Sequence, residues 1–326
     1  MNRTSRWIIG LAALVFMQCV HVGAAEVDSY PSRSPRIIVP YPPGGGGDIV
    51  ARTVGDRLGT ILKQPFLVDN RGGGAGVPAN DFVAKAAPDG YTLLLGQQTG
   101  LVINPLISTT KLPYDPFHDF APISLLYRSP MLVVVINDLP VHSIKDLIAL
   151  AKKMPGKLNY ASAGIGASNH IAVEMFKYMT GTDIVHVPYK GFAPAIIDVL
   201  AGAVQIKFNP VTALLPYVKS GKLRAIAVSS TERIAVLPQV PTIAESGVPG
   251  YQYYLWYSLV APAKTPPSII HTLNREIVKI IAEPATAERF IGAQPVSSTP
   301  EELVKLIREE YESTAKVVKA ANIKAE

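Results

Sequence analysis

The sequence predicts an α/β protein with two lobes and a cleft between them. At 326 residues the chain is longer than one hydrophobic core usually serves, so two structural units are expected. Short apolar runs alternate with helical segments, which is typical of parallel sheets with right-handed crossovers. A second αβ series lies inside the first, so the chain crosses between the lobes near Tyr127 and again near Tyr251. Strand ends and helix starts then converge on the cleft.

The first residues are not expected to belong to the folded part. Arg3 and Arg6 form a basic start, residues 7–20 are apolar, and small residues precede Ala25. This pattern predicts a signal peptide, residues 1–25, that is cut after Ala25 and directs the chain to the periplasm. The apolar run is too short and too early for a transmembrane helix. Cleavage would remove the only cysteine and two arginines, which lowers the formal net charge from +6 to +4.

The composition argues against several functional classes. A hydrophobic content of 48% and a charged content of 17% describe a folded globular protein. There is no basic stripe of the kind that binds nucleic acid. The glycine loops lack the Gly-Lys-Ser/Thr ending of a nucleotide loop, and the histidines and acidic residues lack metal-ligand spacing. We therefore expect no cofactor, no bound metal and no enzymatic activity.

The opening stretch Arg36–Asp48 organises the first lobe. Its apolar run Ile37–Val39 predicts a buried strand, and the prolines that follow prevent the strand from continuing. The glycines at 44–47 allow the main chain to approach a ligand closely, and Asp48 is expected to be the N-cap of a helix over 49–62. Free amide hydrogens and the positive helix end make this stretch a candidate anion site; a flexible turn before a helix is the alternative.

The remaining elements divide between the lobes, with residues 26–127 and 250–326 in the first and 128–249 in the second. In the first lobe we expect strands over 66–71 and 91–96, a helix ending near 86, and a helical region over 267–320 with breaks near Pro284 and Pro295. Crossing strands are expected over 121–136 and 251–261. The second lobe is expected to contain strands over 158–163, 183–189, 204–208 and 223–229, and helices over 143–153, 169–179, 193–201 and 213–220, with a short helix within 237–247.

A second glycine loop, Gly164–Ser168, repeats the arrangement in the other lobe. Its glycines, its hydroxyl and the helix that follows would offer amides to a second carboxylate. In the alternative interpretation this is an ordinary capped helix, and the Ser168 hydroxyl is the N-cap. His170 would either donate to a carboxylate or be satisfied by neighbouring backbone, and His186 is interpreted as structural. Tyr41 would stack on a ligand, donate its hydroxyl to it, or simply fill the lobe surface.

Six motifs span nearly the whole mature chain. They are Pro-Tyr-Pro-Pro-Gly-Gly-Gly-Gly-Asp at 40–48, Asn-Arg-Gly-Gly-Gly-Ala-Gly at 70–76, Pro-Asp-Gly-Tyr at 88–91, Tyr-Ala-Ser-Ala-Gly-Ile-Gly-Ala-Ser-Asn-His at 160–170, His-Val-Pro-Tyr-Lys-Gly at 186–191 and Leu-Pro-Gln-Val-Pro-Thr-Ile-Ala-Glu-Ser-Gly at 237–247. As an ordered set they resemble the Bug, or TctC-like, family of solute-binding proteins from tripartite tricarboxylate transporters.

The resemblance implies a two-lobed, periplasmic-binding-protein-like fold (type II) in which the two crossing strands act as a hinge. It also implies capture of a small mono- or dicarboxylic acid through backbone amides, and delivery to integral membrane subunits of a transporter by a monomeric protein. We take as candidate ligand contacts Tyr41, Pro43, Gly44, Gly45, Gly46, Asp48, Gln97, Thr99, Gly164, Ile165, Gly166, Ala167, Ser168, His170 and Asn209.

Two departures from the family pattern leave the ligand unidentified. Gly166-Ala167-Ser168 replaces the common Gly-Ser or Gly-Thr, and Asn209 stands where an acidic residue is frequent. A sensory protein that signals to a membrane kinase, or an exported enzyme acting on a carboxylate, are the alternative functions.

Neither candidate loop contains Arg or Lys. Affinity is therefore expected to depend on backbone geometry, so that a bulkier residue at Gly45 or Gly164 prevents binding, whereas the solvated Lys190 contributes little.

Overall fold

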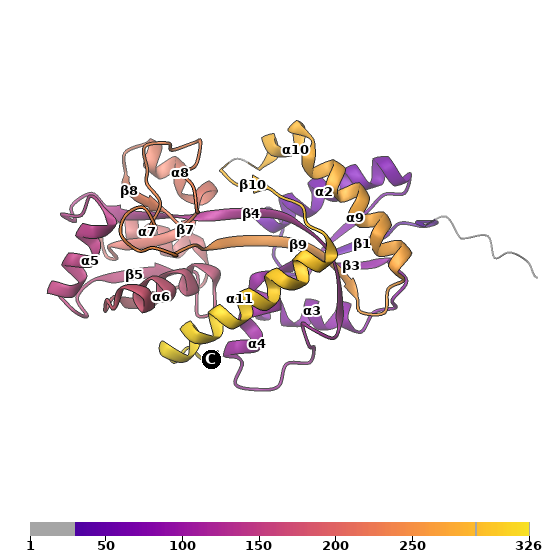
Figure 1. Cartoon of the computed structure of the whole chain (residues 1–326), viewed down its shortest axis with the longest axis horizontal. Helices are drawn as coiled ribbons and strands as arrows, with labels where there is room; N and C mark the ends of the chain where they lie inside the picture. Colours follow the sequence, from indigo (N-terminus) through magenta and orange to yellow (C-terminus); the bar gives the residue numbers. More distant parts are fainter. Residues whose placement is uncertain (1–29, 291, 326) are drawn as a thin grey trace, which may run out of the picture. The chain divides into compact units, whose positions relative to one another are not determined.

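A ten-stranded sheet runs through the computed structural model, which describes residues 30–290 and 292–325 of the chain (Figure 1). The predicted signal peptide and its cleavage site lie outside these residues. Residues 33–326 cluster as one unit, to which the following description applies. Within the described part of the chain, no helix is long and apolar enough to cross a membrane.

The elements alternate along the chain as the sequence predicts. The strands are β1 (Arg36–Val39), β2 (Leu67–Asn70), β3 (Thr92–Gln97), β4 (Phe120–Ile136), β5 (Asn159–Ser162), β6 (Val185–Pro188), β7 (Ile206–Pro210), β8 (Leu223–Val228), β9 (Tyr254–Pro262) and β10 (Gln294–Pro295). The helices are α2 (Gly46–Leu62), α3 (Val77–Ala84), α4 (Asn104–Ile107), α5 (Ile144–Lys153), α6 (Ser168–Thr180), α7 (Phe192–Leu200), α8 (Val211–Lys219), α9 (Pro267–Ala282), α10 (Pro284–Arg289) and α11 (Pro300–Ala320), together with a 3-10 turn, η1 (Gly74–Gly76), and a π turn, η2 (Thr99–Ile103).

The strand order is β2-β1-β3-β9-β4-β7-β5-β6, and β8 and β10 also pair with β4. In the first lobe β1 is parallel to β2 and β3, and in the second lobe β5 is parallel to β6 and β7. Strand β4 is antiparallel to β9 over one part of its length and to β7 and β8 over the other. The predicted α/β class, its parallel units and its crossing strands are thus confirmed.

Three local predictions were wrong or incomplete. The segment 237–247 forms turns and not a short helix; Thr242 and Glu245 bond each other's backbone amides there, which closes a tight turn. The break near Pro295 contains β10, which pairs with β4. The helical turns η2 and α4 were not predicted, because residues 99–107 lack helical periodicity.

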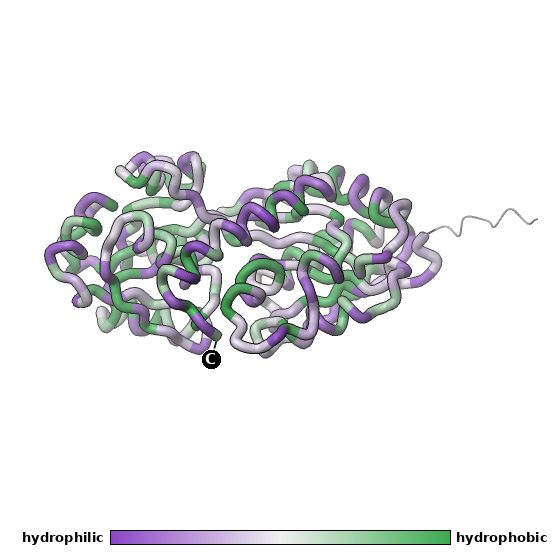
Figure 2. The backbone as a smooth tube through the Cα atoms, turned by 60° about the horizontal axis from the view of Figure 1, so that its bottom comes forward, coloured by the Kyte–Doolittle hydropathy of each residue, from purple (hydrophilic) through white to green (hydrophobic). Residues whose placement is uncertain are grey.

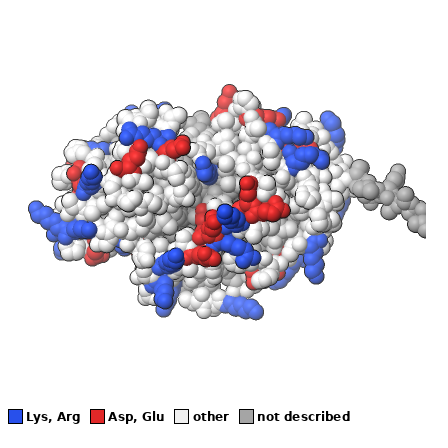
Figure 3. Space-filling model, in the orientation of Figure 1, with Lys and Arg blue, Asp and Glu red and all other residues white. Residues whose placement is uncertain are grey.

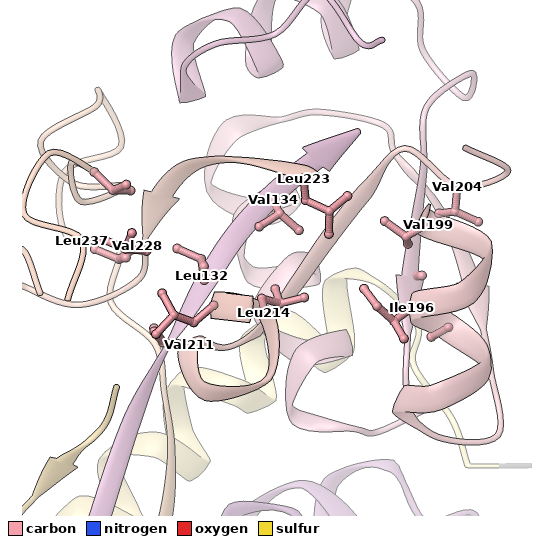
Figure 4. Close-up of a cluster of buried hydrophobic side chains, with 14 residues drawn as sticks. Leu132, Val134, Ile196, Val199, Val204, Val211, Leu214, Leu223, Val228 and Leu237 are labelled. Carbon is pink, nitrogen blue, oxygen red and sulfur yellow. The ribbon is translucent and has the colours of Figure 1, made fainter. Parts of the chain in front are cut away.

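Each lobe has its own hydrophobic core. In the second lobe Leu132 and Val134 from β4 meet Ile196 and Val199 from α7 and Leu214 from α8, all of them buried (Figure 4). In the first lobe the core contains Ile38, Leu94, Val260, Trp256 and Leu303. Hydrophobic and hydrophilic residues alternate along the outer helices (Figure 2), as expected when one helix face covers a core.

Replacing Leu132 should test how strongly the second lobe depends on β4. Leu132 is fully buried, so Leu132→Ala should lower the free energy of unfolding by about 2–5 kcal/mol through lost burial and a residual cavity. Ile197 on α7 is 63% exposed, and Ile197→Ala should change it by no more than about 0.5 kcal/mol. Urea denaturation of both variants measures the difference; equal losses would contradict this assignment of the core.

Candidate functional site

The first candidate loop, Tyr41–Gly47, connects β1 to α2. The helix begins at Gly46 with Gly45 as its N-cap, so the prediction of Asp48 as the N-cap was wrong. Gly46 and Gly47 adopt helical angles, which brings Asp48 into the first turn, where a carboxylate is also stabilised by the helix dipole. Its Oδ2 accepts hydrogen bonds from the Gly44 amide at 2.9 Å and from Arg52 Nε at 3.1 Å.

Asp48 and Arg52 hold this loop against the end of β2. The Arg52 guanidinium also donates to Asn70 Oδ1 at 3.0 Å, and Asn70 Nδ2 donates to the Tyr41 carbonyl at 3.1 Å. Burial of the Asp48 carboxyl acts to raise its pKa, but the hydrogen bonds from Arg52 and Gly44 outweigh it and hold the pKa below its usual value. The ionised Asp48 carboxylate therefore holds the loop in place. It also occupies the Gly44 amide of the loop, which is then not available to a ligand.

Tyrosines support the other side of the first loop. A Cβ atom added at Gly47 would lie 3.1 Å from Leu95 Cδ2, 3.2 Å from a ring carbon of Tyr257 and 3.3 Å from one of Tyr41, so a larger residue would have to displace these side chains by a few tenths of an ångström. Burial and the neighbouring Tyr257 raise the pKa of Tyr41, and Thr99 is a side-chain hydrogen-bond partner of Tyr41. The Tyr41 and Tyr257 rings meet edge to face with centroids 6.5 Å apart. The structure thus brings the candidates Tyr41 and Thr99 together.

The second candidate loop joins β5 to α6 and uses several of its own amides. Gly164 donates to Ser162 Oγ at 3.1 Å, Gly166 to His170 Nδ1 at 3.1 Å, and Ala167 to the Gly164 carbonyl at 3.2 Å. The expectation that the whole loop offers its amides to a ligand therefore needs correction. The Ser168 amide is better placed for that role, because Ser168 begins the helix and the first turn of a helix leaves its N–H groups without intrahelical partners. The Ile165 amide is also better placed, because it has no hydrogen-bond partner among the described residues.

Ala167, and not Ser168, is the N-cap of α6, and it makes no side-chain capping hydrogen bond. The alternative in which the Ser168 hydroxyl caps the helix is therefore wrong.

Two stacked imidazoles lie beneath the second loop. The His170 and His186 rings are parallel within 10° with centroids 3.9 Å apart, and the Tyr160 ring lies nearly parallel to both, with its centroid 4.8 Å from that of His186 and 6.4 Å from that of His170. His186 Nε2 lies 2.6 Å from Ser162 Oγ, the same hydroxyl that receives the Gly164 amide. Because His170 Nδ1 accepts from backbone, the backbone-satisfied interpretation of His170 agrees with the structure, as does the structural interpretation of His186.

Both imidazoles are held neutral. Burial, and then the electrostatic repulsion that a protonated His170 would experience from His186 and Lys177, lower the pKa of His170 to about 3. Burial and Lys177 lower the pKa of His186 to about 4. His170 must be neutral to accept the hydrogen bond from Gly166, because the Nδ1 of a charged His170 would carry a proton and repel the Gly166 amide.

Two other candidates lie at strand ends. Asn209, at the end of β7, accepts from Asn169 Nδ2 at 2.7 Å, and Asn169 Oδ1 in turn accepts the Ala163 amide at 3.2 Å. Asn209 is thus linked to the second loop. Gln97, at the end of β3, is 8% exposed, and its Oε1 has no hydrogen-bond partner within the described residues. A buried polar atom of this kind is a natural contact for a ligand.

The two loops line different cavities. Gly46 lines one of about 440 Å³ together with Tyr127, Thr212 and Phe290. Gly164 and Ile165 line another of about 580 Å³.

The walls of the larger cavity include two residues that the sequence did not single out, Asn104 at the start of α4 and Ser108 after it. They also include Gly74 and Ala75 from the motif at 70–76, and the exposed Lys190. The described residues contain no group of three or more His, Cys, Asp or Glu residues that could hold a metal ion.

Serine substitutions should distinguish the glycines that need special backbone angles. Gly166 has φ of 73°, and a Cβ there would collide with Ile107 Cδ1 in the first lobe. Gly166→Ser should therefore lower the free energy of unfolding by about 1–3 kcal/mol. Gly45 has φ of −83°, and a Cβ there would lie 3.8 Å from the Pro42 carbonyl oxygen, an ordinary contact distance. The expected block by backbone angles therefore does not apply at this position.

Gly45→Ser should therefore change the free energy of unfolding by no more than about 0.5 kcal/mol. Urea denaturation compares the two variants, and a Gly45→Ser loss as large as that of Gly166→Ser would contradict the backbone geometry described above.

The buried imidazoles should make the fold acid-sensitive. Histidine in the unfolded chain takes up a proton near pH 6.5, whereas in the folded protein His170 and His186 stay neutral until about pH 3 and 4, respectively. Their contribution to the free energy of unfolding is therefore fully present above pH 6.5 and is lost as the pH falls toward 4. His186→Gln removes one of these groups and should flatten the fall in unfolding free energy between about pH 6.5 and 5. His271→Gln, at an exposed position, is the control, and equal slopes in both variants would refute the buried-histidine assignment.

Comparison with known proteins places these features in a family. Residues 50–323 match TctC, the tripartite tricarboxylate transporter family receptor. Protein BugT of Bordetella pertussis is 37% identical over 313 residues, which cover 95% of this chain and 96% of BugT.

Solved structures of similar proteins support the same family assignment. The R. palustris Rpa4515 structure with adipate is 36% identical, with a TM-score of 0.80 over 90% of this chain and 99% of that one. MatC from Rhodopseudomonas palustris with bound malate is 30% identical, with a TM-score of 0.76 over 89% and 100%. The periplasmic binding protein BugD is 32% identical, with a TM-score of 0.77 over 91% and 100%. The predicted two-lobed binding-protein fold and the predicted family are therefore confirmed, and the chain belongs to the TctC family, which includes the Bug proteins.

Proposed function

We propose that this protein is a periplasmic solute-binding protein that captures a small mono- or dicarboxylate without chemically changing it. One observation carries the proposal: in each lobe a helix of more than two turns begins directly after a glycine loop at the end of a parallel strand, at α2 and at α6. Paired helix starts of this kind favour a ligand with negative charge. Relatives with adipate and with malate support the same ligand class.

The acid is bound mainly by neutral groups. Candidate donors are the Gly45 and Gly46 amides at the start of α2 and the Ile165 and Ser168 amides around the start of α6. Hydrogen bonds to a charged acceptor contribute about 1.5–3 kcal/mol each, so a few converging amides suffice for binding without a salt bridge. Lys190, exposed at the rim of the larger cavity, adds a screened and therefore small attraction.

Closure of the lobes would complete the site. We place the lobe boundaries at residues 26–127 with 250–326, and at 128–249, so that β4 and the approach to β9 form the hinge. Rotation at these few residues would bring the two loops onto one ligand. The family assignment supports the further proposal that the loaded, monomeric protein delivers its ligand to membrane subunits of a tripartite tricarboxylate-type transporter.

A thermal-shift experiment with matched probes tests the ligand class. Adipate or another short dicarboxylate should raise the melting temperature, because a ligand at 100 times its Kd stabilises a protein by about 2.7 kcal/mol. Hexane-1,6-diol has the same carbon chain as adipate but no charge, and it should have no effect. A shift with the diol or with a sugar, in the absence of a shift with any of a panel of mono- and dicarboxylates, would exclude the proposed function.

A further inference from the structure

A cavity of about 420 Å³ lies beside the hinge and away from both candidate loops. Its walls come from four places: Gln98 after β3, Tyr178 and its neighbouring methionines on α6 in the second lobe, residues 250 and 252–254 before and at the start of β9, and Glu310 and its neighbours on α11. Helix α11 contacts β4 and η2 in the first lobe and α6 in the second, so this cavity spans both lobes. Its size is within the range of small-molecule sites.

Glu310 provides a carboxylate at the wall of this cavity, and that carboxylate has only neutral partners. Its Oε2 accepts from Gln98 Nε2 at 2.7 Å and from Trp256 Nε1 at 2.8 Å. Gln98 is fixed in turn, because its Oε1 accepts from the Tyr253 hydroxyl at 2.9 Å. Among the described residues Glu310 takes part in no ion pair, whereas its neighbour Glu309 lies 3.8 Å from Lys305 Nζ.

An ionised carboxylate at this position is energetically unfavourable when no cation is bound beside it. Burial raises the pKa of Glu310 to about 7, although the Trp256 and Gln98 hydrogen bonds oppose the shift. A cation bound in contact with Glu310 would neutralise the negative charge of its carboxylate. The described part of the protein itself provides no counter-charge for this group.

The other side chains that line the cavity can contact an apolar group attached to that cation. Tyr178 is 56% exposed and Met179 39% exposed, and both line the cavity with Met175 and Tyr254. Aromatic faces and thioethers contact both apolar groups and organic cations favourably. Acidic and basic side chains gather along α11 on this face, and much of the surface around them is uncharged (Figure 3).

We propose that this cavity is a second binding site, for a small organic cation that carries a primary ammonium group on an apolar body. The ammonium group contacts Glu310 and the apolar body lies against Tyr178 and the methionines of α6. This site is independent of the carboxylate-binding cleft in its chemistry, so it stands whether or not the proposed function is correct.

Position links the second site to the cleft. Gln98 supports Glu310 and lies between Gln97 and Thr99, two of the candidate contacts of the cleft. Because α6 and α11 come from different lobes, lobe rotation changes the distance between the two walls. A cation bound here would therefore favour one lobe arrangement over the other.

The probe for this site is 2-phenylethylammonium, measured by isothermal titration calorimetry on the mature chain without any carboxylate present. We expect saturable one-to-one binding to the unmodified protein and no binding of 2-phenylethanol, which lacks the charge. Glu310→Gln should weaken binding about tenfold or more, since a hydrogen bond to a charged group is lost. Glu309→Gln, one residue away and paired with Lys305, should change the affinity by about twofold at most.

The dependence of binding on pH provides a second readout. Tyr178, Tyr253, Tyr254, Glu309 and Lys316 are the other titratable groups in the wall of the cavity. Ionisation of Glu310 near pH 7 should make binding about tenfold tighter at pH 8 than at pH 6, and Glu310→Gln should abolish that difference.

Ser313→Trp, at an exposed position on the cavity wall, should block the probe even if Glu310→Gln does not fold. Failure of the unmodified protein to bind the probe, or equal affinity in the Glu310→Gln and unmodified proteins, would overturn the proposal.

Discussion

Strand β4 is the constraint on which both lobes depend. Its 17 residues pair with β9 and β10 in the first lobe and with β7 and β8 in the second, so a single extended segment fixes the strand register in both halves of the sheet. Leu132 and Val134 in its second half are core residues of the second lobe. An irregularity in the β4–β8 pairing between Val133 and Val134 shows that the register of this strand is not uniform. A strand shared by two cores can bend between them without losing either, which is what a hinge requires.

The candidate cleft is built from neutral groups, and charge is used mainly to support them. Asp48 and Arg52 fix the first loop, and Gly44 gives its amide to Asp48. Neutral His170 and His186 fix the second loop through Gly166 and Ser162. Only some amides of each loop therefore remain available to a ligand. These candidate hydrogen-bond donors lie around the starts of α2 and α6. A preorganised neutral site of this kind gains affinity because few groups must be reordered when the acid binds.

The sequence predicts features that are encoded locally. Prolines and glycines mark both candidate loops, and apolar runs mark β1 and β4, so the order of elements and the two crossings could be deduced. Features that depend on tertiary contacts could not. The turns η2 and α4 lack periodicity and are held by distant partners, as when the Tyr114 hydroxyl donates to the Gly100 carbonyl and Asn104 Nδ2 to the Ala75 carbonyl. The helix start at Gly46 was missed for a related reason, since a glycine run accepts helical angles but does not signal them.

In the binding mode that we propose, backbone amides at the starts of two helices, one in each lobe, hold one carboxylic acid. Two-dimensional ¹H–¹⁵N NMR of the mature protein during titration with adipate tests it most directly. We expect the amide signals of Gly45 or Gly46 and of Ile165 or Ser168 to move together and to saturate at the same adipate concentration. Saturable shifts confined to one lobe, or centred on Lys190 with neither helix start affected, would contradict it.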